Sequence, residues 1–237
     1  MKKNKLNINY WLRKLYTTRL FQYLPINKSL LKKKIFTSIY KSKHWVQNPN
    51  DLSNQFISVS GPGSNTYSDQ YKNLIKNFYL IIDKYEIKSI IDIPCGDFLW
   101  IKKIIHEKKI KYLGVDIVEE LIKENKSKYQ NENINFSTGD IVSFEIKEKY
   151  DLILVRDLLI HLDNIDIIKI LNNLKKMNVK YLAINNYEIN KNKDVIIGQH
   201  RQVNILIEPY NFPRPIFSFN DHAKDKFIYI YDISKIK

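Results

Sequence analysis

From residue 67 onward, the chain alternates between two hydrophobic patterns. Apolar residues three or four positions apart predict helices, and short apolar runs between polar residues predict buried strands. We expect helices over 67–82, 99–105, 118–129 and 165–174, the last one capped by Asp163 or Asn164. We expect strands over 89–93, 111–116, 134–137, 152–155 and 181–184, with later candidates at 203–207 and 227–231. This alternation predicts an α/β fold with a mostly parallel sheet covered by helices on both faces.

The first 50 residues differ from the rest of the chain in their charge. Apolar residues recur at helical spacing over 8–16 and again over 31–40, where three consecutive lysines interrupt them. This segment holds twelve Lys or Arg residues and no Asp or Glu, whereas the remaining residues hold 27 basic and 25 acidic side chains. The sequence therefore predicts a basic, amphipathic helical arm over 1–50 and a nearly neutral domain over 51–237.

Three roles of the arm stay open at this stage. A basic amphipathic helix with Trp11 and Phe36 can bind an anionic membrane surface, and the same charge can attract nucleic acid. Alternatively, the arm packs on the domain with its lysines in solvent. No apolar run approaches the ~20 residues that span a bilayer, and the single cysteine, Cys95, excludes an internal disulfide. We expect a cytoplasmic protein, held peripherally at the inner membrane surface if the arm binds lipid.

Acidic residues follow the first three predicted strands at intervals of 24 residues, at Asp92, Asp116 and Asp140. Open α/β sheets bind ligands at the carboxyl ends of their strands. An acid at the end of the second strand is placed to accept hydrogen bonds from ribose hydroxyls. Asp140 is placed to accept the exocyclic amine of an adenine, and Gly96 lies in the turn where the backbone must approach a ligand closely.

The residues around these acids resemble a known family. Residues 92–98, DIPCGDF, are similar to the first motif of class I S-adenosylmethionine-dependent methyltransferases, with Pro94 and Phe98 replacing two of its three glycines. Together with 58–64, 114–118, 156–162 and 211–213, they resemble one bacterial subfamily with SGxGS, DxPCGDFxW, GxDIV and RDxLxHL motifs, over residues 40–232. The resemblance implies a Rossmann-like seven-stranded sheet with an antiparallel last strand, S-adenosylmethionine as cofactor, and methyltransferase activity.

The resemblance also implies a cofactor site. It places Asp92, Cys95, Gly96 and Asp97 around the methionine moiety, Asp116 at the ribose, and Asp140 and Ile141 beside the adenine. The full set of expected cofactor residues is Asp92, Pro94, Cys95, Gly96, Asp97, Phe98, Asp116, Ile117, Asp140, Ile141 and Arg156. From its own surroundings in the sequence, Cys95 is a packing residue rather than a nucleophile. Phe98 packs its helix or stacks near the cofactor.

Asp157 and His161 follow the fourth predicted strand at i, i+4 spacing, so a helical turn would place both on one face. His161 is the candidate general base for a hydroxyl acceptor. Alternatively, the two side chains pair to orient the loop while Arg156 anchors the sheet. The acid/Asn-Pro-Pro-aromatic pattern of amino-methylating enzymes does not follow this strand, which favours an oxygen acceptor. Because clustered carboxylates are missing, no metal site is expected; the alternative is a single Mg²⁺ held by Asp157 and the amides of Asn185 and Asn186.

The candidate substrate residues come from two loops. They are Ser60, Gly61, Gly63, Ser64, Arg201 and Asn204. The sequence favours O-methylation of a small molecule or of a surface-glycan sugar or precursor. The alternatives are an RNA methyltransferase that uses the basic arm and a non-catalytic scaffold with a degenerate fold. Nucleic acid is disfavoured because residues 51–237 are nearly neutral.

Overall fold

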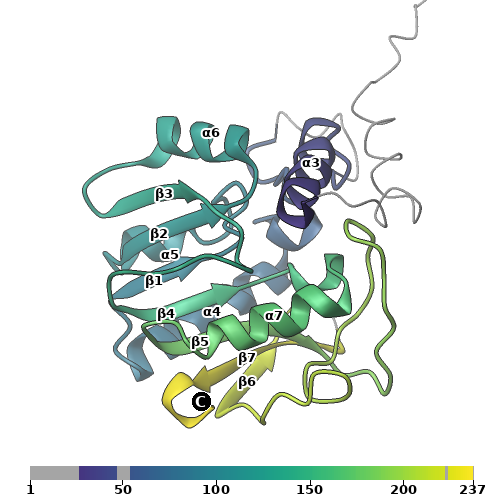
Figure 1. Ribbon diagram of the computed structural model, residues 1–237. Coiled ribbons are helices and arrows are strands. Elements are labelled where there is room, and N and C mark those ends of the chain that lie inside the picture. The colour runs from purple at the N-terminus through teal and green to yellow at the C-terminus, as the bar shows by residue number, and fades with distance from the viewer. Residues whose placement is uncertain (1–26, 47–53, 222–223, 237) are drawn as a thin grey trace, which may run out of the picture.

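The computed structural model describes residues 27–46, 54–221 and 224–236. In these residues, seven strands form a single sheet in the order β3-β2-β1-β4-β5-β7-β6 (Figure 1). The strands are β1 (Ser89–Asp92), β2 (Lys111–Asp116), β3 (Ile134–Thr138), β4 (Tyr150–Val155), β5 (Val179–Tyr187), β6 (Phe217–Asn220) and β7 (Lys226–Asp232). Strands β1 to β5 are parallel, and β7 is antiparallel to both β5 and β6. The predicted Rossmann-like sheet is therefore confirmed.

Helices cover both faces of this sheet. They are α3 (Lys28–Lys41), α4 (Asp69–Lys84), α5 (Lys102–Glu107), α6 (Glu119–Tyr129) and α7 (Asn164–Leu174), with short 3-10 turns η2 (Pro62–Ser64), η3 (Leu159–His161) and η4 (Ile233–Lys235). Helices α3 and α7 pack on one face and α4 and α5 on the other (Figure 1). Helix α6 contributes Leu121 to the first core and Ile122 to the second.

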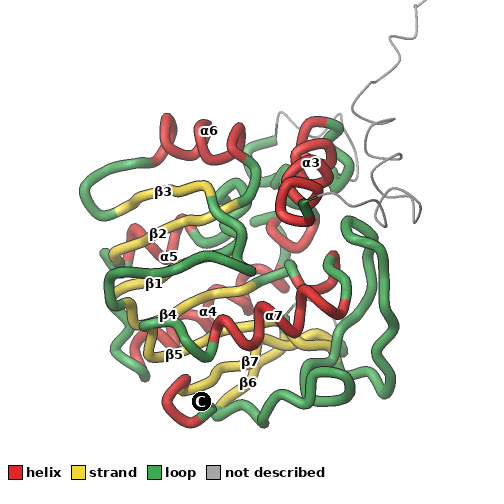
Figure 2. The backbone as a smooth tube through the Cα atoms, in the orientation of Figure 1, coloured by secondary structure: helices red, strands yellow, loops and turns green. Residues whose placement is uncertain are grey.

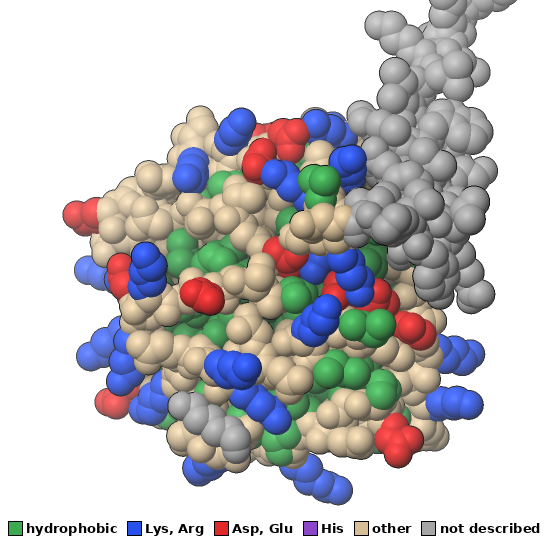
Figure 3. Space-filling view, viewed as in Figure 1, with side chains coloured by type: hydrophobic (Ala, Val, Ile, Leu, Met, Phe, Trp, Pro, Cys, Tyr) green, Lys and Arg blue, Asp and Glu red, His purple; other side chains and the backbone are tan. Residues whose placement is uncertain are grey.

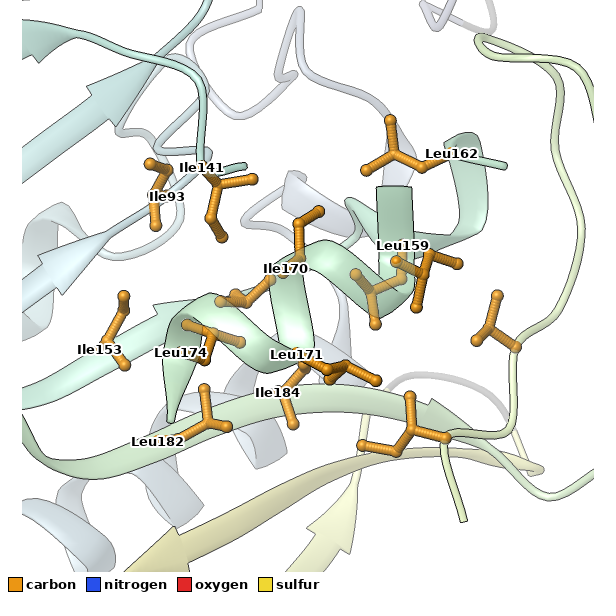
Figure 4. Close-up of a cluster of buried hydrophobic side chains, with 14 of the residues drawn as sticks. Ile93, Ile141, Ile153, Leu159, Leu162, Ile170, Leu171, Leu174, Leu182 and Ile184 are labelled. Carbon is orange, nitrogen blue, oxygen red and sulfur yellow. The ribbon is translucent and has the colours of Figure 1, made fainter. Parts of the chain in front are cut away.

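Successive side chains of a strand point to opposite faces of the sheet, and the central strands show this period of two. Ile153 belongs to the core under α7, whereas its neighbours Leu152 and Leu154 belong to the core under α4. Figure 4 shows the first core, where Leu171 and Leu174 of α7 lie over the sheet. These strands are apolar on both faces because helices cover both.

The predicted elements from 67 to 187 correspond closely to the observed ones. The predicted strand at 203–207 is wrong, since this segment lies in the long loop between β5 and β6 (Figure 2). Val203 and Ile205 are buried there against the α7 face of the sheet, and a single hydrogen bond, from the amide of Tyr187 at the end of β5 to the carbonyl of Val203, does not extend into a strand. The strand β6 was missed, because only four residues form it at the edge of the sheet.

The apolar run at 31–40 forms α3, as expected. Asn27 caps the helix by accepting hydrogen bonds from the amides of Ser29 and Leu30. Ile35 and Ile39 are buried in the same core as the sheet, so this part of the arm packs on the domain. The other helix expected in the arm, over 8–16, lies outside the described residues. Among the residues that the structure describes, no helix has the length and apolar character needed to cross a membrane.

Candidate functional site

A cavity opens where strands β3, β2, β1 and β4 end, and its outer wall comes from α3 and Trp45. The empty space in it, with the open solvent at its mouth included, is about 990 Å³. From the expected cofactor set, Pro94, Cys95, Gly96, Asp116, Ile117, Asp140, Ile141 and Arg156 line it. The cavity thus opens at the carboxyl ends of the parallel strands, beside residues that the resemblance assigns to the cofactor.

Gly96 sits at the closest approach of two loops. Its φ is +54°, in the left-handed region, and a Cβ atom at this position would lie 2.4 Å from Ser60 Oγ. Ser60 Oγ in turn accepts a hydrogen bond from the amide of Asp97 at 2.9 Å. A side chain at residue 96 would therefore separate the turn after β1 from the loop that carries Ser60.

Asp116 lies at the end of β2 and faces the cavity. Its Oδ1 accepts from the amide of Val118 at 3.0 Å, and its Oδ2 accepts from the amide of Gly96 at 3.2 Å. Burial raises the pKa of Asp116 to about 6, against the lowering effect of these hydrogen bonds. A carboxylate offers about four lone-pair sites, and the amides of Val118, Gly96 and Ile117 all act on this one, so one site stays open for a ribose hydroxyl. The residues at this end of the cavity therefore fit the nucleoside part of S-adenosylmethionine.

Asp140 is held differently from the prediction. Its Oδ1 accepts from the amide of Val142 and from Lys32 Nζ, and its Oδ2 accepts from Ser29 Oγ and lies 2.8 Å from Lys32 Nζ. These contacts occupy all of the roughly four lone-pair sites of the carboxylate. Asp140 can therefore accept an adenine amine only if α3 gives up one of its contacts. Ile141, the next residue, lines the cavity as expected.

Three expected cofactor residues lie behind the cavity wall. Asp92 is 1% exposed and accepts a hydrogen bond from the hydroxyl of Tyr112, and burial raises its pKa to about 8. Asp97 accepts from the hydroxyl of Ser58 and the amide of Val59, and so fixes the loop before α4. Phe98 is fully buried and stacks in an aromatic cluster. These residues support the wall instead of lining it.

Cys95 behaves as the packing residue that the sequence indicated. The thiol is 2% exposed, and burial raises its pKa well above its usual range. A thiol that stays protonated is a poor nucleophile. Asn125 donates to the backbone carbonyl of Gly96 at 2.7 Å and lies 3.9 Å from the sulfur, so it braces the turn from behind.

Arg156 anchors a buried charge network beside the cavity. Its guanidinium donates to both carboxylate oxygens of Asp221, at 3.2 and 3.0 Å, and to the carbonyl of Gly63 at 2.7 Å. It also lies over the ring of Trp100, 4.8 Å from the centroid. Lys226 completes the network between Asp221, at 3.0 Å, and Asp157, at 2.7 Å. Asp221 directly follows β6 and Lys226 begins β7, and neither carried a sequence signal.

Asp157 and His161 both line the cavity, but they do not share a helical turn. Asp157 has a φ of +56°, and His161 ends the 3-10 turn η3. The carboxylate of Asp157 pairs with Lys226 and with Arg156. The pKa of Asp157 stays low because these two cations outweigh its burial. The expected Asp157–His161 pair is therefore replaced by a separate partner for each residue.

His161 is fixed from two sides. Its Nδ1 lies 3.0 Å from the carbonyl oxygen of Gln199. Because a carbonyl only accepts, Nδ1 carries the proton and the lone pair is on Nε2. The indole of Trp45 stacks on the imidazole with centroids 4.9 Å apart and planes at 25°. Burial lowers the pKa of His161 to about 4, so the ring is neutral near pH 7 and its Nε2 can accept a hydrogen bond.

The expected substrate residues divide into two groups. Ser60 and Ser64 line the cavity, while Gly61 and Gly63 stand behind it; a Cβ atom at Gly63 would lie 2.9 Å from Asp157 Oδ2. Arg201 and Asn204 do not line the cavity. Arg201 donates to the carbonyl of Leu159, among other loop groups, and Asn204 donates to the carbonyl of Ile189. Both residues hold the β5–β6 loop in place, which corrects their assignment to substrate.

Twelve residues that line the cavity were not among the site residues expected from the sequence. They are Lys32, Phe36, Tyr40, Trp45, Val59, Trp100, Val118, Leu121, Gly139, Leu158 and Leu162, together with Ile93 behind the turn. The helical spacing of apolar residues over 31–40 was the available signal, because a helix with such a stripe must bury it. In the described ranges, no three His, Cys, Asp or Glu side chains gather as a metal site requires.

Comparison with known proteins agrees with this geometry. Residues 90–179 match the family model "Methyltransferase domain". Over 100 residues, the chain is 33% identical to malonyl-[acyl-carrier protein] O-methyltransferase 2 from Ilyobacter polytropus; the match covers 38% of each chain. The chain thus spans less than half the length of this curated relative.

Solved structures show the same fold. Human N-acetylserotonin methyltransferase in complex with SAM has a TM-score of 0.58 at 13% identity, covering 94% of this chain and 65% of that one. The N-methyltransferase NodS of Bradyrhizobium japonicum, in complex with S-adenosyl-L-homocysteine, has a TM-score of 0.55 at 13% identity, covering 81% and 97%. Residues 90–179 thus match a methyltransferase domain model, and the whole sheet has the fold of these two solved methyltransferases.

Proposed function

We propose that this protein transfers a methyl group from S-adenosylmethionine to an acceptor hydroxyl, on a small molecule or a sugar precursor of a surface glycan. The observation that carries the proposal is the position of His161. Its neutral, singly protonated ring stands on the wall of the cavity that Asp116 and Gly96 also line. Asp116 ends β2 and His161 follows β4, and these strands are two strand spacings, or ~10 Å, apart.

The chain supplies binding, alignment and a proton acceptor. S-adenosylmethionine, when bound, supplies an electrophilic methyl carbon on its sulfonium. Asp116 would hold the ribose, and the turn at Gly96 would receive the methionine part against the backbone. His161 Nε2 would accept the hydroxyl proton as the oxygen forms its bond to carbon. The carbonyl of Gln199 favours the resulting imidazolium, since it already accepts from Nδ1–H.

Calorimetry with S-adenosylhomocysteine tests the cofactor half of the proposal. Asp116→Ala removes the carboxylate and leaves a ribose hydroxyl unpaired, so affinity should fall by about 1–3 kcal/mol. Asp69→Ala, an exposed acid outside the cavity, is the matched control and should bind as the wild type does. Failure of the wild-type protein to bind would reject the proposed function.

Turnover tests the role of His161. With an acceptor found by screening with methyl-labelled cofactor, His161→Ala should lower the rate about 10²–10⁴-fold and leave cofactor affinity unchanged. A variant that is less stable but retains its specific activity would make His161 structural. Binding of the cofactor with no methyl transfer to any hydroxyl in the screen would favour the scaffold alternative, and selective methylation of RNA would favour the nucleic-acid alternative.

A further inference from the structure

The side chains that line the cavity differ between the part near β2 and the part near β4. At the β2 end, the wall includes the carboxylate of Asp116 and the turn at Gly96. At the β4 end, Leu158 and Leu162 flank the turn that carries His161, and Phe36 and Trp45 close the outer side. The rings of Phe36 and Trp45 lie 6.2 Å apart, and Trp45 stacks on His161. The acceptor side of the cavity is therefore an aromatic and aliphatic wall around one neutral base.

The charged residues of this wall are already paired inside the protein. Lys32 is 3% exposed and contacts two carboxylates, at 2.8 and 3.2 Å. Arg156 is bound to Asp221 through both oxygens. Asp157 lies 2.7 Å from Lys226. A charged acceptor would have to take one of these groups from its partner and leave the other buried and uncompensated, which is costly.

We propose that the acceptor is an uncharged hydroxyl compound with a planar, apolar body that packs against Trp45 and Phe36. This inference rests on the proposed function and narrows its acceptor class. Burying an apolar body against this wall is favourable, and a flat ring can stack as the neighbouring aromatic rings do. In the transfer, the acceptor O–H bond breaks as its proton passes to His161 Nε2. The oxygen bonds to the methyl carbon, and the carbon–sulfur bond breaks with its electron pair remaining on the sulfur of S-adenosylhomocysteine.

Three matched probes test this acceptor class on protein saturated with S-adenosylhomocysteine. They are 2-naphthol, 6-hydroxy-2-naphthoate, which adds a carboxylate to the same ring system, and methyl β-glucoside, which offers hydroxyls without a planar body. We expect calorimetry to show 2-naphthol binding at least about tenfold more tightly than either of the other two. Tighter or equal binding of the carboxylate or the glucoside would overturn the inference.

Variants of the wall provide the second test. Trp45→Ala should weaken 2-naphthol binding by about tenfold, whereas Trp45→Phe should restore most of it. Tyr67→Ala, which removes a 58% exposed ring outside the cavity, is the control and should change nothing. Affinity for S-adenosylhomocysteine is measured separately. In a variant, retained affinity shows that the protein is folded; in the wild type, it shows whether the proposed function holds. If Trp45→Ala binds both S-adenosylhomocysteine and 2-naphthol as the wild type does, the proposed wall is wrong while the methyltransferase proposal stands.

Discussion

Replacing Lys32 by methionine should show how strongly α3 is tied to the domain. The ammonium lies between Asp140, at 2.8 Å, and Asp166, at 3.2 Å, and these carboxylic side chains are 10% and 1% exposed. Removing one partner of a buried ion pair costs about 3–5 kcal/mol, because the remaining charge stays buried without compensation. Lys28 still contacts Asp166 at 2.8 Å. We therefore expect a loss near the lower end, about 3 kcal/mol in the free energy of unfolding.

Urea unfolding followed by circular dichroism measures this loss. Lys34→Met is the matched control, since Lys34 is on the same helix but exposed to solvent, and it should change stability by less than about 0.5 kcal/mol. Adding Asp140→Asn to Lys32→Met should cost less than the two separate losses combined, because the carboxylate that loses its contact with Lys32 is then gone, whereas Asp166 keeps Lys28. Equal stability of the Lys32 and Lys34 variants would refute the reasoning. It would mean that the ion pairs contribute no more than surface contacts do.

Three further predictions follow from the geometry. Gly96→Ala should lose about 1–2 kcal/mol of stability from its left-handed backbone and more from contact with Ser60 Oγ; in thermal melts, adding Ser60→Ala should recover only the second part. The pKa of His161 is lowered to about 4, below the ordinary 6.5, so the unfolded chain binds the extra proton between these values and stability must fall as pH drops from about 6.5 to 4; His161→Gln should remove that part of the pH dependence in urea titrations. A chain beginning at residue 27 should keep its melting temperature and lose salt-sensitive pelleting with anionic vesicles, whereas one beginning at residue 47 should be unstable.

The central sheet could be predicted because its signals are local. Runs such as 89–93 and 111–116 are apolar, short and bounded by polar residues, and the strand-end acids mark where parallel strands finish. The β5–β6 loop misled the same reasoning. Val203 and Ile205 alternate with polar neighbours as a strand does, yet the amide of Ile205 donates to the side chain of Asn186, at 2.7 Å, instead of to a strand. Burial in a loop and burial in a sheet leave the same local pattern.

The electrostatic part of the site depends on contacts between distant segments. Arg156 meets Asp221 across 65 residues, and Lys32 meets Asp140 across 108. The motif after β4 drew attention to Asp157 and His161, but nothing in the nearby sequence indicates that Lys226 would occupy the carboxylate of Asp157. Their i, i+4 spacing predicted a shared helical face, and the left-handed backbone at Asp157 breaks that turn. Short-range spacing was therefore a guide to which residues reach the cavity and a poor guide to their partners.

The charge of the arm is a second case in which the sequence did not identify the partners of charged residues. Twelve basic residues without an acid indicated a surface that attracts an anionic partner. On α3, however, Lys28, Lys32, Lys33 and Lys41 each contact acidic side chains of the domain. Their partners come from α6, the start of α7 and the turn after β3, so the nearly neutral domain presents its acids where the arm presents its lysines. A strongly basic segment can be attracted to acidic residues of the same chain as well as to an outside partner. Six of the twelve basic residues precede residue 27, and four of the others are paired on α3, so we predict that any salt-sensitive membrane binding depends chiefly on residues 1–26, whereas α3 forms a wall of the cavity.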